Sequence, residues 1–233
     1  MKFKIVSLFV LCAILISCGT SRQGGKKQRK GTKAQVVLTP EQQRKYDYFF
    51  LEASRLKMKD DYSAAFDLLQ HCLTINPNAS SALYEISQYY MYLKQVPQGQ
   101  AALEKAVEND PDNYWYSQGL ASLYQQQNEM QKATNLLESM ATRFSDRMDP
   151  LYSLLDIYNR LEEYDNVITT LNRLEEKMGK NEQLSMEKFR IYLQKKDNQS
   201  AFREIESLVE EYPMDMRYQV ILGDVYMQND KKD

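Results

Sequence analysis

Residue types recur along most of the chain with a period of 34 residues. When units are counted from Tyr46, the same types return at the same positions through five full units, without an insertion or deletion. Position 11 of the unit is aromatic in all units but the first, position 20 is small or short, and position 24 is leucine or isoleucine. A constant period of this length predicts a repeat architecture in which each unit is one supersecondary element.

The repeated positions have physical roles in a pair of packed helices. Position 11 holds Leu56, Tyr90, Tyr124, Tyr158, Tyr192 and Tyr226, position 20 holds Ala65, Gly99, Ala133, Val167 and Ala201, and position 24 holds Leu69, Leu103, Leu137, Leu171 and Ile205. The small residue lets two helices approach closely, and the tyrosine fills the space between helices while its hydroxyl reaches a polar partner at the edge. Pro77, Pro111 and Pro213 are expected to end the second helix, because proline lacks an N–H.

Each unit is predicted to contain two antiparallel helices joined by a short turn, such as KMKDDY in the first unit. One helix pair cannot bury both of its faces, so neighbouring pairs are expected to stack into a solenoid. The predicted units are 46–79, 80–113, 114–147, 148–181, 182–215 and a partial sixth at 216–233. The partial unit has a first helix without a second. We interpret it either as a truncated form of a longer repeat protein or as a native cap.

This pattern covers about four-fifths of the chain and resembles the tetratricopeptide repeat (TPR) family. The resemblance implies an all-α fold, a right-handed superhelix of helix pairs, and a concave groove that binds a protein or peptide partner. In that family, residues 2, 5, 9, 12 and 13 of each unit face the groove. On this chain they include Phe50, Tyr84, Gln88, Tyr92, Trp115, Gln118, Tyr152, Asn159, Arg160 and Arg190. The alternative is that these side chains fill contacts between adjacent first helices.

Two positions depart from the pattern of the family. Position 8 is normally small but holds Leu155 and Phe189 in the fourth and fifth units, so these units are expected to pack at altered angles. Position 7 is normally apolar but holds Glu52 and Lys188, which are expected to weaken the outer units. Both departures concern the shape of the superhelix and leave the fold assignment intact.

The N-terminus has the pattern of a targeting segment. Lys2 and Lys4 precede an uncharged run from Ile5 to Ile16. This run is shorter than the about 20 residues that a membrane-spanning helix needs, and it matches the apolar core of a signal peptide. The four residues that end in Cys18, LISC, resemble the lipobox of bacterial lipoproteins.

The lipobox resemblance implies a signal peptide at 1–17, a diacylglyceryl group on Cys18 and a flexible basic linker at 18–40. An uncleaved anchor and an ordinary signal peptide are the alternatives. Gly19 stands where some lipoproteins have the aspartate that signals inner-membrane retention. We therefore predict that the protein is anchored in the outer membrane and faces the periplasm.

Charge divides the chain into two parts. Residues 1–33 contain eight lysines and arginines and no acid, while residues 34–233 contain 22 basic and 32 acidic side chains. The acidic body argues against a nucleic-acid partner, because phosphate binding needs clustered basic residues. The basic residues behind Cys18 are expected to act as a tether and to contact anionic lipid headgroups.

The sequence contains no recognisable catalytic constellation. The single histidine, His71, is followed by Cys72, and neighbouring residues on a helix point in different directions. Glycine-rich phosphate loops, zinc-ligand spacings and nucleophile motifs are absent from the sequence. We predict that the chain is not an enzyme and that it needs no metal or cofactor.

The pattern as a whole favours a non-catalytic, lipid-anchored TPR scaffold that mediates protein–protein interaction at the bacterial cell envelope. One alternative is a subunit of the outer-membrane assembly machinery, whose TPR lipoprotein has a similar architecture. The other is a lipoprotein that binds a glycan or small ligand through aromatic groove residues such as Trp115.

Overall fold

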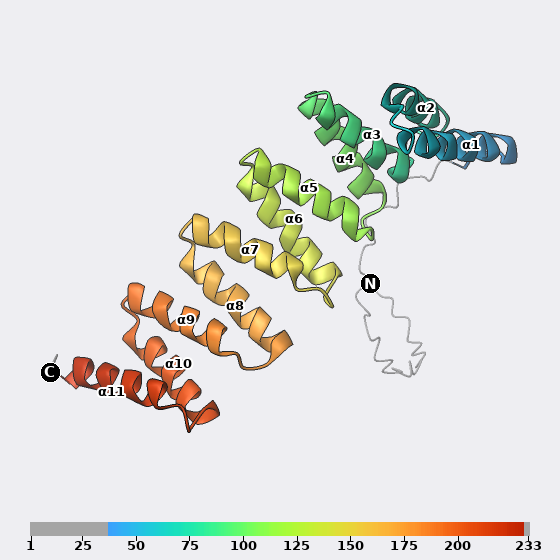
Figure 1. The fold of residues 1–233 in the computed structure, drawn as a ribbon. Coiled ribbons are helices and arrows are strands. Elements are labelled where there is room, and N and C mark those ends of the chain that lie inside the picture. Colours follow the sequence, from blue (N-terminus) through green and yellow to red (C-terminus); the bar gives the residue numbers. More distant parts are fainter. Residues whose placement is uncertain (1–36, 231–233) are drawn as a thin grey trace, which may run out of the picture. The chain divides into compact units, whose positions relative to one another are not determined.

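The structure, a computed structural model, describes the backbone of residues 37–230 and the side chains of residues 37–227. The predicted signal peptide and Cys18 lie outside the described residues. The described part contains eleven helices and no strand (Figure 1). They are α1 (Pro40–Lys57), α2 (Tyr62–Ile75), α3 (Ser80–Tyr92), α4 (Val96–Asn109), α5 (Tyr114–Gln126), α6 (Met130–Arg143), α7 (Asp149–Arg160), α8 (Tyr164–Met178), α9 (Glu182–Gln194), α10 (Asn198–Glu211) and α11 (Met216–Asp230).

Each helix packs against the next one along the chain, so consecutive helix pairs follow one another in a row (Figure 1). This arrangement confirms the predicted all-α solenoid of helix pairs. The first helix begins earlier than the predicted unit start at Tyr46, because α1 already starts at Pro40. Thr39 and Gln42 form a reciprocal capping box there, with Gln42 N–H donating to Thr39 Oγ1 at 3.2 Å and Thr39 N–H to Gln42 Oε1 at 2.9 Å. Pro40 therefore belongs to the helix and not to the predicted linker.

The turn inside each full unit has one backbone conformation, with position 15 in the left-handed region. The residues there are Asp60, Lys94, Asn128, Glu162 and Lys196, with φ between 57° and 62°. In the second unit, Gln95 N–H donates to the Tyr90 carbonyl at 2.8 Å and Lys94 N–H donates to the Met91 carbonyl at 3.0 Å. The other four units repeat both bonds, which define a Schellman motif. A residue with a Cβ is disfavoured in this region, so the packing of the two helices holds each turn.

Close approach of the two helices in a unit explains the small residue at position 20. Ala65, Ala133, Val167 and Ala201 are fully buried there. A Cβ added to Gly99 in the second unit would lie 3.1 Å from the carbonyl oxygen of Ser87 and 2.7 Å from the terminal carbon of Met91. A side chain on α4 at this point would therefore have to displace the end of Met91 and move the backbone of α3 by a few tenths of an ångström.

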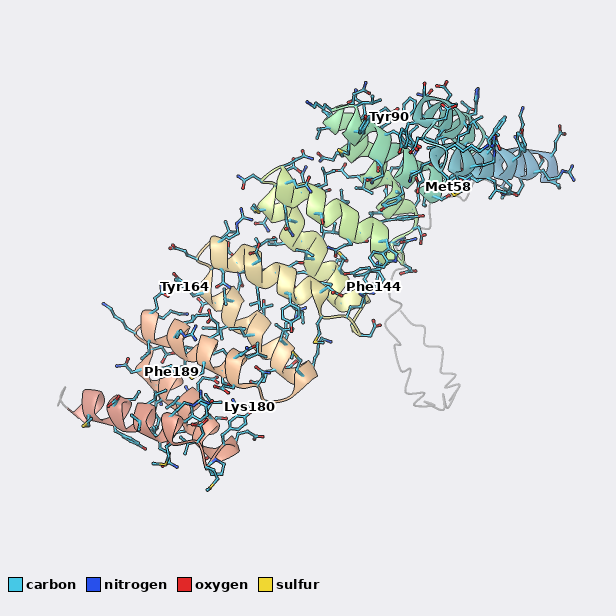
Figure 2. The ribbon with its side chains drawn as sticks, in the orientation of Figure 1. Met58, Tyr90, Phe144, Tyr164, Lys180 and Phe189 are labelled. Carbon is cyan, nitrogen blue, oxygen red and sulfur yellow. The ribbon has the colours of Figure 1, made fainter. Side chains whose placement is uncertain are left out.

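Two of the tyrosines at position 11 join neighbouring units in the way that the sequence suggests. Tyr124 is buried on α5 and donates a hydrogen bond to Glu104 of α4 at 2.9 Å. Tyr158 on α7 repeats this bond with Glu138 of α6 at 3.4 Å. At position 8, the bulky Phe189 is buried in the C-terminal apolar cluster beside Ala201 and Ile205 of α10 (Figure 2).

Candidate binding surface on the first helices

Trp115 lies in the first turn of α5, where it is 64% exposed. The side chain of Asn113 caps this helix and accepts hydrogen bonds from the backbone N–H groups of Trp115 at 3.1 Å and Tyr116 at 3.4 Å. The ring of Tyr114 stands edge-on to the indole, with 5.3 Å between ring centroids. The cap fixes the first turn, so the indole projects into solvent from a rigid helix end.

Arg147, in the loop between α6 and α7, packs on the same aromatic rings. Its guanidinium carbon lies 3.9 Å from the ring centroid of Tyr114 and 5.6 Å from that of Trp115. Phe144, labelled in Figure 2, packs edge-on against Tyr114 at 5.3 Å. We call Tyr114, Trp115, Phe144 and Arg147 the Trp115 cluster. It combines tryptophan, tyrosine and arginine, the residue types most enriched among the hot spots of protein interfaces.

A charge partner keeps the guanidinium in place. Arg147 donates to Asp149 at 3.0 Å, at the start of α7. Partial burial opposes the charged form of Arg147, but the hydrogen bond and the charge of Asp149 raise its pKa above the ordinary value. Burial also raises the pKa of Tyr114, so its ring is an uncharged phenol at neutral pH. The cluster therefore offers a cationic group, a phenol and an exposed indole to a ligand.

Gln88 and Tyr92 come together in a second feature, a surface hollow of about 440 Å³. Lys57 at the end of α1, Tyr62 at the start of α2 and Tyr89 on α3 complete its lining. Tyr92 is 80% exposed, whereas Tyr89 is almost fully buried. We call this the tyrosine hollow.

Three predicted groove residues are used within the fold. Tyr84 stacks on Tyr116 of the next first helix, with ring centroids 4.8 Å apart. Phe50 is half-buried in the N-terminal apolar cluster, and Gln118 accepts a hydrogen bond from Tyr114 at 3.1 Å. For Tyr84 the structure therefore shows the alternative role, a contact between adjacent first helices.

The other four predicted residues lie exposed on α7 and α9. Tyr152 donates to the sulfur of Met178 at 3.4 Å, and Arg190 pairs with Glu187 at 2.9 Å on its own helix. Asn159 and Arg160 are exposed at the end of α7. They are accessible to a ligand, but the structure does not gather them into a pocket with the tyrosine hollow.

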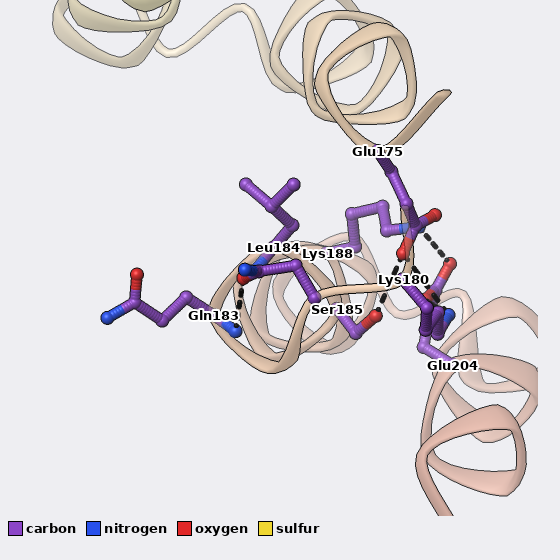
Figure 3. A network of polar contacts seen from close by, with 8 residues as sticks. Glu175, Lys180, Gln183, Leu184, Ser185, Lys188 and Glu204 are labelled. Carbon is purple, nitrogen blue, oxygen red and sulfur yellow. Dashed lines mark hydrogen bonds and ion pairs between the residues drawn. The ribbon is translucent and has the colours of Figure 1, made fainter. Parts of the chain in front are cut away.

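The one buried group of opposite charges among the described side chains surrounds Lys188 on α9. Its ammonium lies 2.8 Å from Glu175 of α8 and 2.9 Å from Glu204 of α10 (Figure 3). Lys180 approaches the same two carboxylates at 3.3 Å and 3.5 Å, and Ser185 donates to Glu175 at 3.2 Å. Position 7 is thus filled by a charge with partners on both neighbouring helices, which the sequence pattern did not indicate.

This ion cluster is suited to a structural role and not to proton transfer. Burial opposes ionisation of Lys188, but its hydrogen bonds to Glu175 and Glu204 raise the net pKa above the ordinary value. Burial also opposes ionisation of Glu175, yet Lys188 and Lys180 lower its net pKa. The lysine therefore keeps its proton at neutral pH and cannot serve as a nucleophile or a base. At the other outer position 7, Glu52 pairs with Arg55 on the surface of α1.

Cys72 and His71 also lack the surroundings of a reactive pair. Cys72 is fully buried, and burial raises the pKa of its thiol to about 11, while His71 is exposed. Among the described side chains, no three or more histidines, cysteines, aspartates or glutamates are grouped so that they could hold a metal ion. None of the helices within residues 37–230 has both the length and the apolar character of a membrane span.

Sequence reasoning missed the residues that complete both features. Tyr62 and Tyr89 stand at positions 17 and 10 of their units, outside the groove positions of the TPR pattern. Arg147 belongs to a turn between units, and only the fold brings it onto Trp115. The abundance of tyrosine in the first two units was a signal, but it did not say which rings share a surface.

Comparisons with known proteins agree with the fold. A family model for the tetratricopeptide repeat matches residues 80–113, which is the second predicted unit. A search of curated proteins finds no match to the chain. A TPR protein from Parabacteroides merdae has a similar structure, with 17% identity, a TM-score of 0.53, and coverage of 81% of this chain and 75% of that one.

Two further solved structures are similar. MamA shows 18% identity and a TM-score of 0.52, over 76% of this chain and 96% of that one. YrrB, described as a TPR protein with an unusual peptide-binding site, shows 13% identity and a TM-score of 0.50, over 74% of this chain and 89% of that one. At these identities the similarity concerns the fold. The chain therefore has the fold of TPR proteins, a solenoid of helix pairs.

Proposed function

We propose that this protein is a non-catalytic scaffold that binds a protein or peptide partner through the Trp115 cluster, and that a lipid on Cys18 holds it at a bacterial envelope membrane. A solenoid presents its first helices as an extended surface, which is the common use of repeat folds. YrrB, a structure of similar fold, is described with a peptide-binding site, which supports the same use here.

The exposure of Trp115 is the observation that carries the binding proposal. A large aromatic ring that is 64% exposed leaves apolar area in water, and burying it against a partner is favourable. Arg147 and Tyr114 hold polar and cationic groups next to that area. Such an arrangement of an apolar ring with polar neighbours is typical of a protein-binding hot spot.

The binding proposal is tested by affinity capture from membranes with the mature protein, followed by identification of the retained proteins. We expect Trp115→Ala to lose the partner and Tyr48→Ala, which removes an equally exposed ring on α1, to retain it. Retention of no protein above a tether-only control would overturn the proposal. Recovery of outer-membrane assembly subunits would identify the partner as that machinery.

An exposed indole also stacks on sugar rings, so a glycan ligand is the second candidate. Trp115 is the only tryptophan in the chain, and its fluorescence therefore reports on this site alone. A change in the Trp115 emission when peptides from the captured protein are added supports the scaffold function. A change by soluble oligosaccharides alone would replace it with the glycan-binding function.

The anchoring part of the proposal rests on the lipobox pattern at Cys18 and on the basic residues that follow it. Metabolic labelling with palmitate in a bacterial host tests it. We expect the label on the wild-type chain and its loss in Cys18→Ala. Equal labelling of both chains would contradict lipidation of Cys18. Fractionation of the labelled cells then reports whether the protein resides in the outer membrane.

A further inference from the structure

The tyrosine hollow lies where the turn between α1 and α2 meets α3. Its volume of about 440 Å³ falls within the range of ordinary ligand sites, about 300–1,000 Å³. Tyr62, Tyr89 and Tyr92 supply three aromatic rings, and the centroids of the first two are 6.4 Å apart. Because Tyr62 and Tyr92 are substantially exposed, their rings are accessible to a ligand.

The hydroxyl of Tyr89 is buried and has no hydrogen-bond partner among the described residues. Tyr89 as a whole is only 8% exposed, and its ring packs against Phe66 with 5.9 Å between centroids. Buried polar groups are almost always paired, since an unpaired one has lost its water without compensation. A ligand group that accepts a hydrogen bond in the hollow would supply the missing partner once the Tyr89 ring shifts and uncovers its hydroxyl.

The hydroxyl is available as a donor, because burial raises the pKa of Tyr89 and keeps it protonated at neutral pH. The charges around the hollow are already paired. Lys57 contacts Glu85 at 2.7 Å, and Tyr62 donates its hydroxyl to Asp60 at 2.7 Å. The site therefore favours an uncharged acceptor, such as a peptide carbonyl, next to an apolar group that packs on the rings.

A proline-rich segment has this combination of groups. In the polyproline II conformation the carbonyls make no internal hydrogen bonds, and proline has no N–H that would be buried unpaired. Its pyrrolidine rings pack against aromatic side chains, and its preformed shape loses little conformational entropy on binding. An ordinary extended peptide would also bring N–H groups, for which the lining offers only Gln88 and tyrosine hydroxyls as acceptors.

We propose that the tyrosine hollow binds a proline-rich, extended segment of the partner, with a proline ring against Tyr62 and Tyr92 and a backbone carbonyl accepting a hydrogen bond from Tyr89. This inference rests on the proposed scaffold function and names the chemistry of the segment that the scaffold recognises. The hollow lies at the C-terminal end of α3, and the Trp115 cluster lies at the N-terminal start of α5, the next first helix along the chain.

The test uses the full chain without its signal peptide and a fluorescein-labelled oligoproline peptide, followed by fluorescence anisotropy. The control peptide has alanine in place of every proline. We expect the oligoproline to bind and the alanine peptide not to bind. Equal affinity for both peptides, or binding of neither, would overturn the inference.

Three variants locate the binding site. Tyr89→Phe removes only the hydroxyl and is expected to weaken oligoproline binding about three- to tenfold. Tyr92→Ala removes an exposed ring and is expected to weaken it about tenfold, without a folding penalty. Tyr48→Ala, an exposed tyrosine outside the hollow, should leave the affinity unchanged. Unchanged affinity in both hollow variants would assign the peptide to another surface.

The outcome separates this inference from the proposed function. If the oligoproline fails to bind while captured partners are still retained through Trp115, the hollow has another role and the scaffold stands. If no partner is retained by the wild-type chain, the scaffold fails, and oligoproline binding then reports a peptide site with no scaffold role.

Discussion

The second and fifth units fill the same three positions with opposite chemistry. In the second unit, Ile86 at position 7 belongs to one apolar cluster with Ala102 at position 23 and with Leu73 of the preceding unit. In the fifth unit, the equivalent residues are Lys188, Glu204 and Glu175, and they form the buried ion cluster.

The difference teaches that the repeat constrains the three positions as a set. An apolar triple buries its surface without a directional requirement, whereas a charged triple is tolerated only when every charge finds its partner. At these positions α9 is therefore held to α8 and α10 by direction-specific contacts, whereas Ile86 on α3 is held by apolar packing. Substitutions that remove one charge, or that replace the charged set with the apolar set, measure what each set contributes to stability.

The largest effect is expected from removing one member of the ion cluster. Lys188→Met leaves the partly buried Glu175 and Glu204 near each other without their main counter-charge, and we expect a loss of about 3–5 kcal/mol in the free energy of unfolding. Urea denaturation followed by circular dichroism measures it. Arg190→Met, which breaks an exposed pair on the same helix, should cost less than about 1 kcal/mol. Equal costs would show that the buried cluster behaves like a surface pair.

Exchange of the whole set should have the opposite sign. The triple variant Glu175→Leu, Lys188→Ile and Glu204→Ala gives the fifth unit the residues of the second. The variant removes the desolvation cost of these three charges, and Lys180, which loses both carboxylates, keeps contact with solvent. We therefore expect stability equal to the wild type or up to about 4 kcal/mol higher. The same urea experiment tests it, and a triple variant less stable than Lys188→Met would refute the equivalence of the two sets.

The pH dependence distinguishes the two chemistries further. The pKa of Glu175 is lowered in the folded protein, so its contribution is present above the ordinary value of 4.5 and is lost as the pH falls through the folded value. The pKa of Lys188 is raised, so its contribution is present below 10.5 and is lost as the pH rises through the folded value.

We therefore expect the stability of the wild type relative to the triple variant to be constant near neutral pH and to fall at both extremes. Denaturant titrations of both chains across the pH range give this difference directly. A difference that does not change between neutral and acidic pH would mean that Glu175 has no special partner in the folded protein.

A smaller effect compares two tyrosine hydroxyls. Tyr124→Phe removes a hydrogen bond to Glu104 and is expected to cost about 1 kcal/mol. Tyr89→Phe removes a buried hydroxyl without a described partner and is expected to cost nothing or to stabilise by up to about 1 kcal/mol. Thermal unfolding of the two variants and the wild type measures both changes in stability. A larger loss of stability for Tyr89→Phe than for Tyr124→Phe would show that the Tyr89 hydroxyl has a hydrogen-bond partner.

The smallest effect concerns the left-handed turn at position 15. Lys94 has a φ of 59°, which glycine adopts without the steric conflict of a Cβ. We expect Lys94→Gly to raise the free energy of unfolding by about 0.5–1 kcal/mol and Lys94→Ala to give no gain. Denaturant midpoints measure the difference, and a gain in the alanine variant would point to the lysine side chain instead of the backbone.

The fold was predictable because its signals are local. The small residue at position 20, such as Ala133, and the leucine at position 24, such as Leu137, stand four residues apart and so share one face of a helix. Equivalent residues return in every full unit and mark the face that packs. The candidate site was predictable only in part. Trp115 and Tyr92 are exposed as the TPR pattern implied, but Tyr84 packs between helices. The pattern assigns a residue to a face of a helix, and it does not say how closely the next helix covers that face.

By itself, the sequence determined the repeat, the helix pairs and the positions that pack within each unit, because these depend on residues a few turns apart. Only the tertiary structure decided that Lys188 is buried between two carboxylates and that Tyr89 lies in a hollow without a hydrogen-bond partner. The neighbours that decide these environments stand on other helices. Whether a charge is compensated or a hydroxyl is paired depends on distances between helices, and those are set when the units stack.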